Sequence, residues 1–243
     1  MKKLLMLLLL FLSTSINAVV TLNSFSSTNG EASSFIYSHT VSAGTDRIMI
    51  VSVVVRDSSA TVISGVTYGG VSLTELSQTN EGGTVTLGIY SYINPPVGTS
   101  NVIVTLGSTD EASTGAITYN GTNAIGATSL AQTGGTSITN GITTTQTNSK
   151  LVNVTGNRGV DSFTADVNYT IRFNEVTVGN PANSNARNVG LDRDATTIST
   201  YNHTHTLGGF QQWLDYLVEL KEAPPPPSTG PKKGSRSLMG IGR

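Results

Sequence analysis

Short apolar segments, separated by clusters of turn-forming residues, recur along most of the chain. They cover residues 35–41, 47–55, 62–68, 71–76, 85–93, 101–106, 114–119, 151–155, 169–178, 195–201 and 211–220. Many short segments of this kind, with Gly, Asn, Ser and Pro between them, are typical of strands joined by turns. We therefore predict an all-β fold, an antiparallel sandwich of two sheets.

The segment at residues 47–55, RIMIVSVVV, is apolar on both of its alternating faces. A strand of this kind needs cover on both sides. We expect it at the centre of a sheet, with its outer face shielded by a loop or by another chain. The second option makes residues 48–54 a candidate surface for self-assembly.

Turn-forming residues predict tight turns at some places in the chain and longer loops at others. Gly69-Gly70 between two apolar segments predicts a two-residue hairpin, and the prolines at residues 94–98 predict a turn because proline cannot donate to a sheet. Residues 123–148 are rich in Thr, Gly, Ser and Asn with weak alternation, so we expect short strands and long loops there.

Residues 211–220 allow two interpretations. Trp213, Leu217 and Leu220 fall at helical spacing, whereas Leu214, Tyr216, Val218 and Leu220 share one face of a strand. We take the strand.

The two ends of the chain differ from the body. A positive Met1-Lys2-Lys3, nine apolar residues at 4–12 and a short polar stretch ending at Ala18 predict a secretory signal peptide. Residues 19–223 form the predicted sandwich domain, and residues 224–243 a proline-rich spacer and disordered basic tail. We therefore expect a secreted, periplasmic or cell-surface protein, with no transmembrane segment after signal removal.

Composition narrows the choice of partners. Only 12% of residues are charged, and the chain has no cysteine, so no disulfide supports the fold and a packed core must stabilise it. Residues 19–223 carry eight basic and fifteen acidic residues, a net charge of −7. Because nucleic acid binding needs clustered cations, we expect no nucleic acid partner.

Four motifs occur in the order of a known module: VTYGGVSLT at residues 66–74, YINPPVGT at 92–99, GAITYNG at 115–121 and the segment from Trp213 to Ala223. The chain thereby resembles a β-sandwich module of bacterial secreted, surface and phage-associated proteins that is usually left without a function. The resemblance covers nearly all of residues 19–223. It implies a jelly-roll-like antiparallel sandwich, supports the strand at 211–220, and assigns no catalytic residue.

Two clusters are candidates for a metal. His203 and His205 share one face of a strand, as metal ligands do, with His39, Asp192 or Asp194 as a third ligand. Asp192 and Asp194 are candidates for calcium, although the glycine and following acid of a calcium loop are absent. Alternatively, the two histidines are exposed polar residues without a metal. The two aspartates then lie on an edge strand, where Arg193 between them neutralises their charge. Calcium aside, no cofactor is expected.

Sugar binding needs exposed aromatic faces beside polar side chains. Tyr90 and Tyr92 share a face of one strand, Tyr201 lies in a polar segment, and Trp213 is the single tryptophan. The alternative for each is packing across strands. The chain lacks the motifs of serine hydrolases and zinc proteases and a strand with paired glutamates, so no enzyme activity is expected.

These observations favour an exported, non-enzymatic module for binding, adhesion or structural display at a cell or virion surface, with a surface glycan or a protein as partner. A carbohydrate-binding module is the first alternative, and a polysaccharide-directed hydrolase is the second.

Overall fold

A computed structural model describes residues 19–56, 62–177 and 185–224. The predicted signal peptide at residues 1–18 lies outside these residues, as does the predicted tail beyond residue 224. Every regular element in the described part is a β-strand. No helix there has the length and apolarity needed to cross a membrane.

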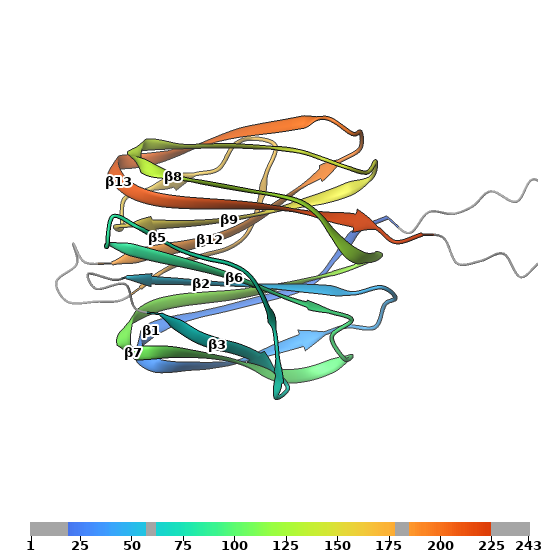
Figure 1. Cartoon of the computed structure of the whole chain (residues 1–243), viewed down its shortest axis with the longest axis horizontal. Helices are drawn as coiled ribbons and strands as arrows, with labels where there is room; N and C mark the ends of the chain where they lie inside the picture. Colours follow the sequence, from blue (N-terminus) through green and yellow to red (C-terminus); the bar gives the residue numbers. More distant parts are fainter. Residues whose placement is uncertain (1–18, 57–61, 178–184, 225–243) are drawn as a thin grey trace, which may run out of the picture.

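The strands form two antiparallel sheets, which confirms the predicted sandwich (Figure 1). The first sheet comprises β1 (Thr21–Val41), β2 (Ile48–Arg56), β3 (Ile63–Tyr68), β4 (Val71–Ser72), β5 (Thr74–Glu81), β6 (Val85–Ile93) and β7 (Gly98–Asn120). The second comprises β8 (Thr122–Thr143), β9 (Ser149–Arg158), β10 (Phe163–Thr164), β11 (Thr170–Val176), β12 (Ala186–Ala195) and β13 (Thr200–Glu222). Each sheet is therefore built from one half of the chain, the blue-to-green strands below and the yellow-to-red strands above in Figure 1.

β2 lies between β6 and β7 in the middle of the first sheet. Its inward side chains join the core between the two sheets. Its outward side chains pack with Phe35 of β1, Val66 of β3 and Val104 of β7. These residues lie in the last part of β1, in β3 and in the first part of β7, which pair with one another and not with β2, so the sheet curls over it. The predicted central position is confirmed, but strands of the same chain cover the outer face. Residues 48–54 are buried, so the predicted self-assembly surface is wrong.

The two sheets repeat one arrangement of strands. In the first sheet, β7 lies between β1 and β2, β6 and β5 follow β2, and β3 pairs with the first part of β7. In the second sheet, β13 lies between β8 and β9, β12 and β11 follow β9, and β10 pairs with the first part of β13. β2 and β9 each follow a non-glycine residue with positive φ, Asp46 and Asn148, and each ends on an arginine, Arg56 and Arg158. The chain is thus an internal duplication, with a repeat of about 100 residues.

Both long strands bend at a bulge of the same form. In β7 the pairing with β1 shifts between Thr105 and Asp110, and in β13 the pairing with β8 shifts between Thr206 and Gln211. The sequences there are TLGSTDE at residues 105–111 and TLGGFQQ at residues 206–212. In both, the leucine points into a core. A bulge bends a strand and redirects the side chains next to it, so equivalent residues of the two halves reach the same end of the molecule.

Other local predictions have mixed outcomes. Residues 211–220 belong to β13, which confirms the strand. Gly69 and Gly70 both have positive φ between β3 and β4, as the hairpin requires, and residues 94–97 connect β6 to β7 as the predicted turn.

Two predictions in the second half are wrong. The Thr- and Gly-rich residues 123–148 are mostly one strand, β8, because pairing with β13 along almost its whole length supplies the order that the weak alternation does not. The strand predicted at 195–201 contains a turn, in which the Thr144 hydroxyl donates to the Thr197 carbonyl at 3.0 Å.

Candidate functional site

The four aromatic side chains selected as sugar ligands do not form one surface. Trp213 is 2% exposed and packs with Ile138 and Leu207, and Tyr90 is 3% exposed in the core of the first sheet. Neither ring has a face open to a ligand. Tyr201 is half-buried beneath the Arg193 guanidinium, 4.8 Å from its ring centre. Tyr92 is also half-buried and lines a shallow hollow with Ile93 and Ile125.

The aspartates selected as metal ligands are engaged elsewhere. β12, which carries both, is an interior strand between β9 and β11, so the edge-strand interpretation is wrong. The buried Asp192 carboxylate accepts hydrogen bonds from Tyr119 at 2.7 Å and Arg172 at 2.8 Å. Asp194 pairs with Lys150. The third candidate, His39, lies in the first sheet and contacts Ser26 and Thr118.

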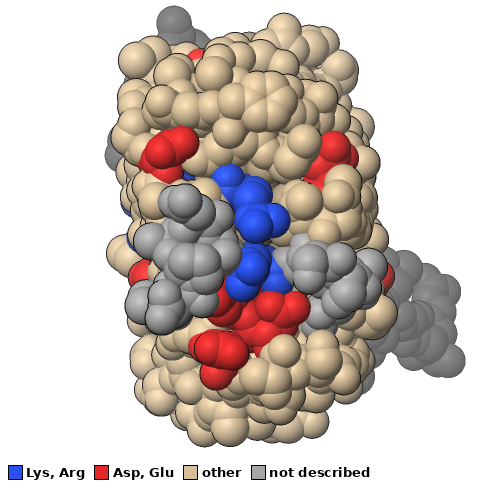
Figure 2. All heavy atoms as spheres, turned by 90° about the vertical axis from the view of Figure 1, so that its left-hand side faces the viewer, with Lys and Arg blue, Asp and Glu red and all other residues tan. Residues whose placement is uncertain are grey.

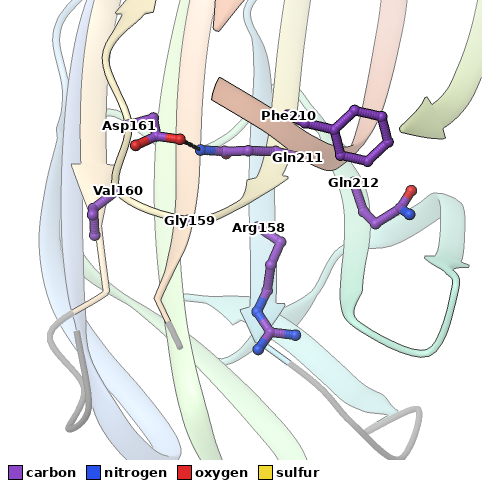
Figure 3. Close-up of a pocket in the computed structure, with 7 residues that line it drawn as sticks. All are labelled: Arg158, Gly159, Val160, Asp161, Phe210, Gln211 and Gln212. Carbon is purple, nitrogen blue, oxygen red and sulfur yellow. Dashed lines mark hydrogen bonds between the residues drawn. The ribbon is translucent and has the colours of Figure 1, made fainter. Parts of the chain in front are cut away.

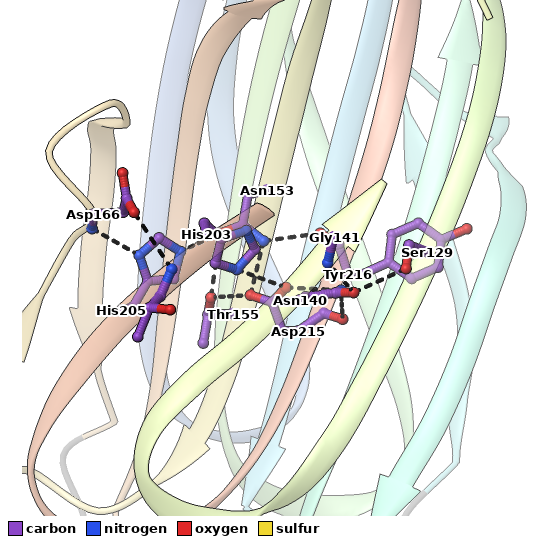
Figure 4. A network of polar contacts seen from close by, with 11 residues as sticks. Ser129, Asn140, Gly141, Asn153, Thr155, Asp166, His203, His205, Asp215 and Tyr216 are labelled. Carbon is purple, nitrogen blue, oxygen red and sulfur yellow. Dashed lines mark hydrogen bonds and ion pairs between the residues drawn. The ribbon is translucent and has the colours of Figure 1, made fainter. Parts of the chain in front are cut away.

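His203 and His205 do come together, but with an aspartate that the sequence analysis did not select. Their rings stack at 4.3 Å between centres, and His203 Nε2 lies 3.2 Å from Asp215 Oδ2 (Figure 4). We call these residues, with Asn140, Asn153 and Thr155, the buried polar cluster. Asp215 also accepts hydrogen bonds from Thr155 at 2.7 Å, Asn153 at 2.8 Å and Asn140 at 3.0 Å.

These partners keep Asp215 charged. Burial on its own would raise the pKa of this carboxyl group, but the contacts from His203 and Asn153 outweigh burial, and the pKa lies below its usual value. Among the described residues, the group at ion-pair distance from the Asp215 carboxylate is His203, which is a cation only when it is protonated.

The hydrogen bonds of His205 define its tautomer. The backbone amide of Asp166 donates to Nδ1 at 2.9 Å, so the proton of the neutral ring lies on Nε2, which donates to Asn153 Oδ1 at 2.9 Å. Burial, followed by repulsion from His203, lowers the pKa of His205 to about 4. The ring is neutral at pH 7, and both of its nitrogens are used.

This tautomer bears on metal binding. His203, His205 and Asp215 each offer a ligand atom within 4.8 Å of the others, and this donor set suits zinc. A ligating nitrogen, however, must have a free lone pair, whereas His205 Nε2 carries its proton and Nδ1 accepts from Asp166. Only His203 and Asp215 remain as ready ligands, so the arrangement fits a charge-paired core better than a metal centre.

The first half of the chain shows that the fold does not require this cluster. By the strand pairings, Val51 and Val53 of β2 correspond to Asn153 and Thr155 of β9. The valines belong to an apolar core that also contains Val102 and Val104 of β7, the counterparts of His203 and His205 in β13. The same place is therefore apolar in one half and polar in the other.

A pocket opens at the end of the second half, on the side of the molecule shown in Figure 2. We call it the end pocket. It has a volume of about 370 Å³. Its lining residues come from the end of β9, the loop after it and the bulge of β13: Arg158, Gly159, Val160, Asp161, Phe210, Gln211 and Gln212 (Figure 3).

The bulge of β13 positions the aromatic side of the end pocket. Phe210 is 71% exposed, although Leu207 at the other end of the bulge is buried. Across the strand pair, a Cβ atom on Gly134 would lie only 2.7 Å from Phe210 Cζ. Glycine at this position therefore lets the ring lie against the backbone of β8.

Hydrogen bonds hold the loop that forms the polar side. Arg187 donates to the carbonyls of Val160 at 3.1 Å and Asp161 at 2.9 Å. Gln211 donates to the Asp161 carboxylate at 2.9 Å and accepts from Asn157 of β9. The loop is thus tied to the sheet, and Asp161 is held in place at the rim.

Two polar atoms at the end pocket have no partner. They are the buried Nε of Arg158 and the buried Oε1 of Gln212. Buried polar atoms are nearly always hydrogen-bonded, so these two lack the partner that such atoms usually have. The arrangement offers an open aromatic ring, a guanidinium, an amide and a carboxylate around one hollow.

The residues of the end pocket do not stand out in the sequence as candidates for a site. The available signal was the repeated TLG motif, followed by Ser-Thr in the first half and by Gly-Phe in the second. An apolar ring in place of a threonine at a bulge indicates a local difference between the halves. No family model, curated protein or solved structure matches the chain.

Proposed function

We propose that the protein is an exported, non-enzymatic binding module that holds a saccharide of a cell or virion surface in the end pocket. The observation that carries this proposal is the 71% exposed ring of Phe210 beside unpartnered polar atoms of Arg158 and Gln212. Export rests on the predicted signal peptide.

The chemistry of a sugar suits this hollow. The C–H face of a pyranose ring is apolar and packs on an aromatic ring, while its hydroxyl groups donate and accept hydrogen bonds. Phe210 offers the ring, Gln212 and Arg158 offer the amide and the guanidinium, and the Asp161 carboxylate accepts from hydroxyls. Small-molecule sites combine a few polar groups with apolar surface in this way.

Hydrolysis finds less support at this place. Glycosidases of the common kinds need two carboxyl groups about 5–9.5 Å apart across the bond. Among the residues that line the end pocket, Asp161 alone carries a carboxylate, and its Oδ2 is engaged by Gln211. A binding role requires no second carboxylate.

Glycan-array binding by the mature protein and by Phe210→Ala tests the proposal. We expect the mature protein to bind a restricted set of glycans and Phe210→Ala to lose at least tenfold in affinity. Phe25→Ala is the matched control, because Phe25 is also half exposed but lies on β1 and does not line the end pocket. Glycan binding that survives in Phe210→Ala, or no binding across a broad array, would contradict the proposal.

A further inference from the structure

We propose that the saccharide bound in the end pocket is acidic, and that its carboxylate is held by the guanidinium of Arg158. This inference rests on the proposed function, because it names the class of ligand for the same pocket. It depends on a comparison of Arg158 with the other arginines and with its own counterpart in the first half.

Arg158 is the exception among the six arginines of the described residues. Three donate hydrogen bonds to a carboxylate or to backbone carbonyls: Arg172 pairs with Asp192, and Arg47 and Arg187 donate to carbonyls. Arg193 lies over two tyrosine rings and Arg56 pairs with Glu111. Arg158 has none of these contacts with a carboxylate, a carbonyl or a ring, and its Nε, like those of Arg187 and Arg193, is buried without a hydrogen bond.

The duplication explains why Arg158 is unpaired. At the end of β2, Arg56 Nη1 lies 3.4 Å from Glu111 Oε1 of β7. Since Val55 pairs with Ala112 and Asn157 with Trp213, the counterparts of Arg56 and Glu111 are Arg158 and Gln212. A neutral amide thus stands where the first half has the carboxylate. The second half keeps the cation but lacks its internal partner.

A carboxylate of the ligand fits the place of the missing partner. Guanidinium and carboxylate groups form two parallel hydrogen bonds in one plane, and such charge-assisted pairs are stronger than neutral ones. Figure 2 shows basic side chains gathered at the centre of this end of the molecule, with acidic side chains above them on both sides and directly below them. Asp161, the acid that lines the pocket, forms no ion pair with Arg158 and is held by Gln211.

Restoring the partner is the sharpest test. Gln212→Glu places in the second half the carboxylate that the first half has, so Arg158 becomes neutralised within the protein. Gln212→Met has a similar size without charge and is the matched control. Arg158→Gln removes the cation. Near-ultraviolet circular dichroism, which reports on Trp213 beside residue 212, checks that each variant keeps its packing.

The probes are oligosaccharides of galacturonic, glucuronic and sialic acid, each immobilised beside its methyl ester. We expect the protein to bind at least one acid tenfold more tightly than the ester, with an affinity that falls as salt rises. Gln212→Glu and Arg158→Gln should abolish the preference for the acid. Gln212→Met should keep this preference, although it binds acid and ester alike more weakly because the amide is lost.

The outcomes separate the two proposals. The protein could bind acid and ester equally, or bind neutral glycans alone, and lose this binding in Phe210→Ala. Either result overturns the acidic ligand but leaves the proposed function standing. An acid preference unchanged in Gln212→Glu also overturns the role of Arg158. Binding of no glycan, acidic or neutral, overturns both.

Discussion

Single residues show how the two halves of the chain differ. At the place where β2 and β7 carry Val53 and Thr114, β9 and β13 carry Thr155 and Asp215. Asp215 is fully buried, lies 3.2 Å from His203 and accepts hydrogen bonds from neutral side chains. A buried charge is costly unless its partners are complete, so the buried polar cluster stabilises the fold only as a unit.

Asp215→Asn is expected to destabilise the protein by roughly 3 kcal/mol. The new amide group would face the Asn153 and Asn140 donors and would leave His203 without its carboxylate. Urea unfolding at pH 7 measures the loss. Asp194→Asn is the control, because the Asp194 side chain is exposed, and its effect should stay below about 1 kcal/mol. Equal effects of the two substitutions would contradict the importance of the cluster.

His39 makes the stability dependent on pH. Burial lowers its pKa to about 4 in the folded protein, against about 6.5 in the unfolded chain. The unfolded chain therefore binds more protons between these values, and the free energy of unfolding should be constant above pH 6.5 and fall by up to about 3 kcal/mol toward pH 4. His205 acts in the same direction.

Urea unfolding at pH 7.5 and pH 4.5 measures this dependence. His39→Gln, which removes one of the two imidazoles whose pKa burial lowers, should unfold with a smaller difference between the two pH values. A variant that retains the full difference would show that His39 does not titrate as its surroundings require.

At the scale of elements, Phe173 of β11 joins the two sheets. Its ring lies against the backbones of Gly115 on β7 and Gly190 on β12, where an added Cβ would come within 2.2 and 2.3 Å of ring atoms. Because these contacts are with a ring in the core, added bulk has no flexible group to displace.

Gly115→Ala should therefore destabilise the protein by about 1–3 kcal/mol through overpacking. Gly65→Ala is the control, since Gly65 lies in β3 with nothing within 4 Å of an added Cβ. Thermal unfolding of both variants measures the difference. A melting temperature for Gly115→Ala as high as that of Gly65→Ala would contradict the close approach.

The strands differ in how well the sequence predicts them. β2 is predictable because its β-branched and apolar residues are continuous, which is typical of a strand covered on both faces. β8 is not, because its order comes from β13 rather than from its own alternation. β12 carries buried polar residues such as Asp192, whose charge is matched by Arg172 from the neighbouring strand, and hydropathy cannot reveal such a pairing.

The candidate site was less predictable for a related reason. The stacking of His203 on His205 follows from their spacing on one strand, but Asp215 reaches them through the bend of β13. Phe210 is exposed because of the bulge, whereas the more obvious aromatic residues Tyr90 and Trp213 are buried. Sequence alone does not show which aromatic side chain a bulge turns outward.

At the scale of the whole molecule, the two halves of the duplication differ in their buried side chains and at their ends. The first half retains an apolar outer core and a neutralised arginine, Arg56, at its end. The second half has the buried polar cluster between two smaller apolar clusters and an unpaired arginine, Arg158, beside an exposed ring. The halves share the core between the sheets, and the residues that line the end pocket all belong to the second half.

The most direct test of this account is a nuclear magnetic resonance titration of the ¹⁵N-labelled mature protein with an acidic oligosaccharide and with its methyl ester. We expect the acid to shift the Arg158 Nε–H signal and the amides of residues 158–161 and 208–212, with little change at Arg56 and residues 107–111. Shifts centred on the first half, shifts scattered over both sheets, or spectra unchanged by any saccharide would contradict it.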